Sequence, residues 1–136
     1  FYDIDSGFFR TSQNTFNEYT SASGMGSWKF PTTLLRNMMK SDEFKSTFLE
    51  RLSYNLNNTW AYKNVNARID EVIEEIGKDE FKRNAERWGN SYSHWEKSIE
   101  SMKKFAKNRN SYVVKYAKTY FGLSNSEVKK YFGDVE

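Results

Sequence analysis

The chain has 136 residues, of which 21 are basic and 18 acidic, so its formal net charge is only +3. This length suits one domain, and a near balance of charge without a long basic run argues against a dedicated nucleic-acid binder. The absence of cysteine excludes disulfides and thiolate metal sites, and no stretch approaches the roughly 18 consecutive apolar residues of a membrane span.

Residues 1–9 are rich in aromatic side chains and predict a short β-strand that Gly7 interrupts. Asp3 and Asp5 share one face of this strand, because side chains at i and i+2 of an extended chain point the same way. Two neighbouring carboxylates repel each other unless a cation compensates, and Mg²⁺ commonly takes one or two carboxylates together with substrate phosphates. Asp3 and Asp5 are therefore candidate metal ligands. The alternative is a strand end where one aspartate caps the turn at Ser6-Gly7 and the other is solvated.

Two other carboxylate motifs fit less well. An EF-hand loop that began at Asp3 would need glycine at its sixth position and glutamate at its twelfth, whereas its fifth residue is Gly7 and its twelfth is Asn14. Aspartate-based phosphatases also place a D-x-D after a strand, but on an α/β sheet, and the rest of this chain does not predict further parallel strands.

Residues 10–31 are rich in serine, threonine, asparagine and glycine and predict a long loop, with Trp28 and Phe30 holding its end. From residue 32 onward apolar residues recur at helical spacing. We therefore expect a mainly α fold built as a single unit: a strand at 1–9, a loop at 10–31 and a helical bundle at 32–136.

Polar capping residues and glycines divide the bundle into helices. The predicted starts are Thr32 or Thr33, Ser41 or Asp42, Asn64, Ser91 or Ser93, Asn110 or Ser111, and Ser124, which has capping-box spacing to Glu127. The predicted ends are Asn57-Asn58, Gly77 as an end or a bend, Gly89 and Gly122. The clearest core-facing stripe consists of Val65, Ile69, Val72, Ile73 and Ile76.

The polar residues of the bundle indicate no further site. His94, the only histidine, is expected at a helix start as a surface or capping residue, so neither a Ser-His-Asp arrangement nor a zinc site is indicated. The acidic stretch 70–75 and the lysines of 97–107 are expected to be solvated helix faces, and the four tryptophans packing anchors. A nucleic-acid surface, which we rank low, would use Lys103, Lys104, Lys107, Arg109 and Lys115.

The order of several short runs along the chain is more informative than any one of them. The longest is Leu35–Leu52, a helix with the pattern F-x-x-x-F-x-x-R, which exits through Leu56-Asn57-Asn58-Thr59-Trp60. The shorter runs follow in order: Ile69-Asp70, Glu86-Arg87-Trp88, Phe105–Arg109 and Tyr120-Phe121-Gly122-Leu123. Behind a D-x-D segment, this order resembles the CotH family, the spore-coat-protein-H-like atypical protein kinases. The segment itself departs slightly from the family's pattern, since Tyr2 stands where tryptophan is common and Gly7 comes early.

The resemblance covers nearly the whole chain and implies a protein-kinase-like fold that transfers phosphate from ATP to serine or threonine hydroxyls of a protein substrate. Asp3 and Asp5 would match the carboxylates that hold Mg²⁺ against the nucleotide phosphates, with Asp3 preferred as the direct ligand. The family's nucleotide-clamping lysine, phosphate-covering loop and catalytic aspartate precede its D-x-D, and this sequence has no match for them.

We therefore expect this chain to be the C-terminal helical part of a CotH-like kinase, with the upstream remainder of the kinase domain as its partner. By itself it is expected to be inactive and to hold neither Mg²⁺ nor ATP. The alternative is a non-catalytic helical interaction module of a spore coat or cell-surface protein. By the same resemblance, the expected location is the spore coat or the cell exterior.

Overall fold

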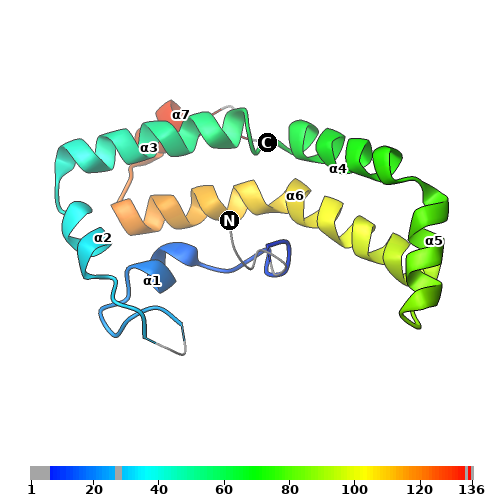
Figure 1. The fold of residues 1–136 in the computed structure, drawn as a ribbon. Coiled ribbons are helices and arrows are strands. Elements are labelled where there is room, and N and C mark those ends of the chain that lie inside the picture. The colour runs from blue at the N-terminus through cyan, green and yellow to red at the C-terminus, as the bar shows by residue number, and fades with distance from the viewer. Residues whose placement is uncertain (1–6, 27–28, 134, 136) are drawn as a thin grey trace.

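The elements follow each other as seven helices in the computed structural model, which describes residues 7–26, 29–133 and 135 (Figure 1). They are α1 (Thr15–Tyr19), α2 (Thr33–Met38), α3 (Asp42–Asn57), α4 (Tyr62–Ile76), α5 (Lys78–Arg87), α6 (Tyr92–Phe121) and α7 (Asn125–Phe132). The prediction of a mainly α fold is confirmed. Within these described ranges there is no strand, only an isolated antiparallel bridge between Met25 and Phe30, and no helix is long and apolar enough to cross a bilayer.

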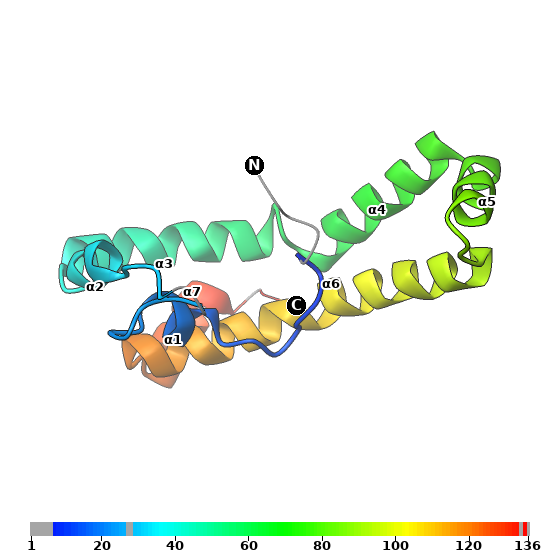
Figure 2. The ribbon, with the colours of Figure 1, turned by 60° about the horizontal axis from the view of Figure 1, so that its bottom comes forward.

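Helix α6 forms the long axis of the molecule. Helices α3 and α4 follow one another along one side of it, and the chain returns beside them through α6 (Figures 1 and 2). At one end α5 contacts both α4 and α6, and at the other end α7 folds back against α3 and α6. The short helix α1 also packs on α6.

The main core lies where α1, α3, α6 and α7 meet. The Phe16 ring of α1 stacks on Tyr120 at a centroid distance of 5.5 Å and meets Phe121 edge to face at 5.7 Å. Leu56 of α3 is 2% exposed and Ala117 of α6 is fully buried. The buried members of this cluster are Phe16, Leu49, Leu56, Ala117, Leu123 and Phe132. Burial of these side chains joins both ends of the chain to α3.

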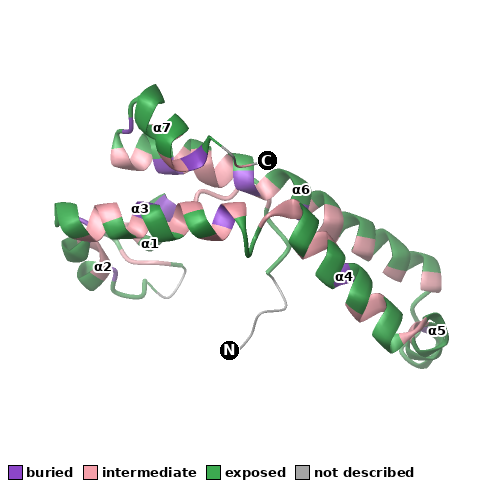
Figure 3. Ribbon diagram, turned by 90° about the horizontal axis from the view of Figure 1, so that it is seen from above, coloured by how far each residue is buried: buried purple, intermediate pink, exposed green. Residues whose placement is uncertain are grey.

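The half of the molecule formed by α4, α5 and the first part of α6 has a thinner core (Figure 3). The predicted stripe of α4 contributes one buried side chain, Ile69, whereas Ile76 at the end of that helix is 44% exposed. Phe81 of α5 stacks on Trp95 of α6 with centroids 3.9 Å apart. This arm therefore depends on fewer large buried side chains than the main core.

Several predicted helix boundaries are confirmed because they depend on local chemistry. The hydroxyls of Ser41, Ser91 and Ser124 each accept a hydrogen bond from the backbone N–H three residues on, at 3.2–3.3 Å. Ser124 and Glu127 form the complete capping box. Gly122 ends α6 in the left-handed conformation at φ 65°.

The predicted helix start at Asn110 or Ser111 is wrong, because α6 runs unbroken from Tyr92 to Phe121. Asn110 is buried and its amide donates to the carbonyl of Trp60 at 2.9 Å and, more weakly, to that of Leu56 at 3.5 Å. An asparagine whose amide has a tertiary partner does not need to cap a helix.

Other expectations also need correction. The predicted loop at 10–31 contains α1, and the described end of the predicted strand, residues 7–9, forms a turn. Helix α4 begins at Tyr62 rather than at Asn64, whose amide donates to the Asn58 carbonyl instead. Isolated apolar residues in a polar stretch leave no period to detect.

The tryptophans predicted as packing anchors divide into two groups. Trp95 packs in the arm, as described above, but Trp60 and Trp88 are 49% and 67% exposed. Trp28 lies outside the described residues. Position near a helix end therefore does not decide whether an aromatic side chain is buried.

Replacing Asn110 with alanine should lower the free energy of unfolding by about 1–3 kcal/mol, because two carbonyls near the end of α3 lose their donor in a buried place. Asn108→Ala is the matched control, since its exposed amide bonds only the Lys104 carbonyl of its own helix, and should cost less than about 0.5 kcal/mol. Urea unfolding of both variants measures the difference. Equal losses would contradict the role given to Asn110.

The capping box should make stability depend on pH through Glu127. Hydrogen bonds from the Ser124 side chain and backbone lower the pKa of this carboxyl, so its stabilisation is complete above the ordinary glutamate pKa of about 4.3 and is lost as the pH falls through the lower folded value. In thermal unfolding, the melting temperature of Glu127→Gln should therefore be lower than that of the wild type at pH 7. At pH 2 the two melting temperatures should be the same. The control Glu86→Gln, which alters an exposed glutamate of α5, should keep the wild-type melting temperature at pH 7. A difference between Glu127→Gln and the wild type that stays the same from pH 7 to pH 2 would refute the assignment.

Candidate functional site

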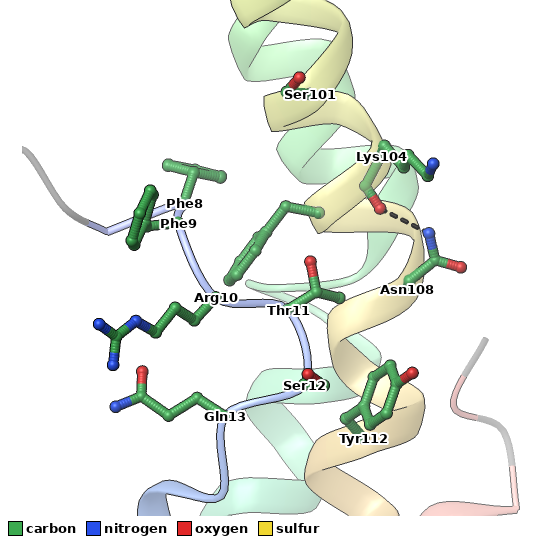
Figure 4. A pocket seen from close by; sticks show the side chains of 11 residues that line it. Phe8, Phe9, Arg10, Thr11, Ser12, Gln13, Ser101, Lys104, Asn108 and Tyr112 are labelled. Atoms are coloured by element: carbon green, nitrogen blue, oxygen red, sulfur yellow. Dashed lines mark hydrogen bonds between the residues drawn. The ribbon is translucent and has the colours of Figure 1, made fainter.

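Asp3 and Asp5, the predicted metal ligands, lie outside the described residues, and the structure describes the segment that follows them. This segment runs along α6 (Figure 4). The rings of Phe8 and Phe105 meet edge to face, with centroids 5.3 Å apart and planes at 67°. The contact places the chain just after the D-x-D on the middle of α6.

Arg109 of α6 holds the backbone of the same segment. Its Nη1 donates to the carbonyls of Thr11 and Gln13 at 2.7 Å each, and its Nη2 donates to Thr15 Oγ1 at 3.4 Å. Burial lowers the pKa of this guanidinium, but arginine remains charged. A half-buried cation is thus met by neutral oxygens of one short segment.

Tyr116 completes the attachment. Its hydroxyl donates to the carbonyl of Ser12 at 2.6 Å, so the carbonyls of three consecutive residues, 11–13, accept hydrogen bonds from α6. Phe105, Arg109 and Tyr116 are spaced four and seven residues apart, which puts them on one face of a helix. We call these three side chains the α6 anchor.

Between the segment and α6 lies an open groove of about 820 Å³. Its charged lining residues are both cations: Arg10, which in Figure 4 extends away from α6, and Lys104 on the helix. The Asn108 amide is engaged by the Lys104 carbonyl at 2.7 Å. The other lining residues are Phe8, Phe9, Thr11, Ser12, Gln13, Ser101, Phe105 and Tyr112. The described residues of its lining include two cations and no carboxylate, and such a lining favours an anionic over a cationic ligand.

Phe8 also borders an apolar groove of about 460 Å³ between α4 and α6. Ile69 and Val72 of α4 and Met102 of α6 are among its lining residues. The ring of Phe8 therefore borders both the polar groove along residues 8–13 and the apolar groove between α4 and α6. The position of the segment depends on the packing of α4 against α6 as well as on the α6 anchor.

The sequence predicts Asp3 and Asp5 as the ligands of a metal ion. Across the described ranges, no group of three or more histidine, aspartate or glutamate side chains is placed to hold one. The donor chemistry of two aspartates fits Mg²⁺, which prefers carboxylate oxygens and completes its shell with water and substrate phosphates. The metal site remains a prediction from the sequence.

Some of the other charged residues singled out in the sequence have partners within the fold. His94 is exposed in the first turn of α6, where its backbone N–H donates to Ser91 Oγ at 3.2 Å, which agrees with the predicted helix start. Asp70 and Lys103, expected to be solvated, form an ion pair between α4 and α6. Lys103 and Arg109, two of the basic residues considered for nucleic acid, thus already have partners within the fold.

The sequence did not reveal the role of Arg109 and Tyr116. Arg109 belongs to the run Phe105–Arg109, but nothing in that run points to its partners, which lie 94–98 positions earlier in the chain. The partner of Tyr116 lies 104 positions earlier. Since both side chains bond mainly backbone carbonyls, the partner residues carry no distinctive side chain either.

Comparison with known proteins gives one match. The model of a family described as CotH kinase protein matches residues 1–113, that is, the D-x-D segment, helices α1 to α5 and most of α6. No curated protein and no solved structure matches the chain. The family match covers most of the 136 residues and confirms the resemblance seen in the sequence: the chain belongs to the CotH family.

Proposed function

We propose that this chain is the helical part of a CotH-type protein kinase that transfers phosphate from ATP to serine or threonine hydroxyls in the presence of Mg²⁺. The observation that carries the proposal is the family match, because it spans the D-x-D and the helical body together. The anchored segment after the D-x-D supports it, since phosphoryl transfer depends on positioning and electrostatic stabilisation.

In this proposal Asp3 and Asp5 supply carboxylate oxygens to the metal site. When bound there, Mg²⁺ neutralises charge on the nucleotide phosphates. The described residues act as the support of that site: Phe8 packs against Phe105 of α6, and Arg109 and Tyr116 hold the path of the following residues along α6.

The proposal requires parts that this sequence does not contain. No residue matches the family's nucleotide-clamping lysine, phosphate-covering loop or catalytic aspartate, so we assign these to a segment outside this sequence. The 136-residue chain alone is accordingly expected to transfer no phosphate. Protein substrates and a location at the spore coat or cell surface belong to the same proposal.

The test is phosphate transfer from labelled ATP by the natural protein in its full length, with Mg²⁺ and with itself and casein as acceptors. The double variant Asp3→Ala, Asp5→Ala should lose at least about 100-fold in rate, because the metal loses its ligands. The matched control is Glu74→Ala, Glu75→Ala, which removes two exposed carboxylates of α4 and should retain activity. Full activity of the aspartate variant would refute the proposal, and an inactive wild type would favour the non-catalytic interaction module.

A further inference from the structure

We propose that Arg109 is a positioning residue, which sets the path of residues 8–15 along α6 and thereby the place of the D-x-D carboxylates. This inference rests on the proposed kinase function, because it concerns the support of that function's metal site. Arg109 itself is not assigned a contact with metal or nucleotide.

The bonding pattern of Arg109 is suited to fixing a path rather than a single point. One nitrogen, Nη1, bridges the carbonyls of Thr11 and Gln13, and the other, Nη2, reaches Thr15 at the start of α1. Tyr116 holds the carbonyl between them, that of Ser12. The segment cannot slide along α6 or rotate about its own axis without breaking at least two of these bonds.

The anchor residue Arg109 is charged, although its position is half-buried. Burial lowers the pKa of the Arg109 guanidinium, which means that the charge loses hydration, and no carboxylate pairs with it among the described residues. A well-packed apolar side chain often anchors a segment with no loss of stability compared with a buried charge. The planar guanidinium offers instead several donors in fixed directions, which is what a defined backbone path needs.

The segment that the α6 anchor holds lies close to the D-x-D in the sequence. Phe8 follows Asp5 by three positions, and three residues of chain span at most about 10–11 Å. A shift of the anchored backbone by 1–2 Å would therefore be passed on over a short length of chain. In metal sites, groups that orient the ligands typically change metal affinity or activity about 10–100-fold when they are removed.

The helix that carries the anchor is itself held in place. Asn110, the residue after Arg109, donates to the carbonyls of Leu56 and Trp60 on the side of α3. Arg109 and Asn110 thus connect the N-terminal segment and the end of α3 to the same turn of α6. A displacement of the N-terminal segment together with this turn of α6 would therefore break the hydrogen bonds of Asn110 to the end of α3.

The first measurement is hydrogen exchange of the natural full-length protein, which reports on the segment without any ligand. Arg109→Gln should speed amide exchange in residues 7–15 and leave the core of α3 and α7 protected. The exchange rate of Arg109→Lys in these residues should lie between the rates of Arg109→Gln and the wild type, because a lysine ammonium does not have the planar, fork-shaped set of donors of a guanidinium. Arg83→Gln, which removes an exposed arginine of α5, is the control and should leave residues 7–15 unchanged.

The second measurement is the affinity for Mn²⁺, used as a paramagnetic substitute for Mg²⁺ and followed by electron paramagnetic resonance. Arg109→Gln should weaken Mn²⁺ binding about 10-fold or more. Tyr116→Phe should weaken it less, because it removes only the bond to Ser12, and it serves as a second test if Arg109→Gln does not fold. Tyr54→Phe, which alters an exposed tyrosine of α3, is the control for Tyr116→Phe in the hydrogen-exchange experiment.

The outcomes separate this inference from the function on which it rests. Unchanged exchange in residues 7–15 of Arg109→Gln would overturn the inference. Faster exchange with unaltered Mn²⁺ affinity would also overturn it, since the anchor would then be merely structural. A wild-type protein that binds no Mn²⁺ would refute the proposed function itself, and the role of Arg109 with it.

Discussion

The amide of Asn110 donates to backbone carbonyls near the end of α3, at Trp60 and Leu56, from the interior of a 30-residue helix. The rest of the structure depends on this arrangement, because it lets α6 continue where a polar residue would otherwise favour a helix end. At a rise of about 1.5 Å per residue, an unbroken α6 is about 45 Å long. Helices α1, α4, α5 and α7 all contact it, so a break at Asn110 would separate the main core from the arm.

The same stretch of α6 supports the candidate site. Phe105, Arg109 and Tyr116 hold the segment after the D-x-D on one face of the helix. The family match extends from residue 1 to residue 113 and so includes Phe105 and Arg109 as well as the D-x-D. The segment of residues 8–15 and the helical body are therefore held together by side chains of one helix.

The free energy expected of its hydrogen bonds distinguishes Arg109 from the exposed ion pairs within single helices. The ion pairs Lys45–Asp42, Arg68–Glu71 and Lys82–Asp79 join exposed side chains within single helices, and such pairs are worth about 0–1 kcal/mol each. A hydrogen bond to a charged group contributes about 1.5–3 kcal/mol, and Arg109 makes two at 2.7 Å to backbone oxygens. Compared with these three pairs, Arg109 therefore has the larger structural consequence, although no acidic side chain among the described residues pairs with it.

The sequence by itself determined the helical class, the caps at Ser41, Ser91 and Ser124, the end at Gly122 and the family, because each depends on residues a few positions apart or on their order. It also predicts Asp3 and Asp5 as ligands of Mg²⁺, which stays a prediction. Only the tertiary structure decided that Asn110 lies inside a helix, that Phe16 in a polar stretch enters the core, and that Arg109 bonds the backbone of Thr11 and Gln13 and the hydroxyl of Thr15. The physical reason is that these three side chains find their partners 32 or more positions away, and several of those partners are backbone carbonyls, which every residue has.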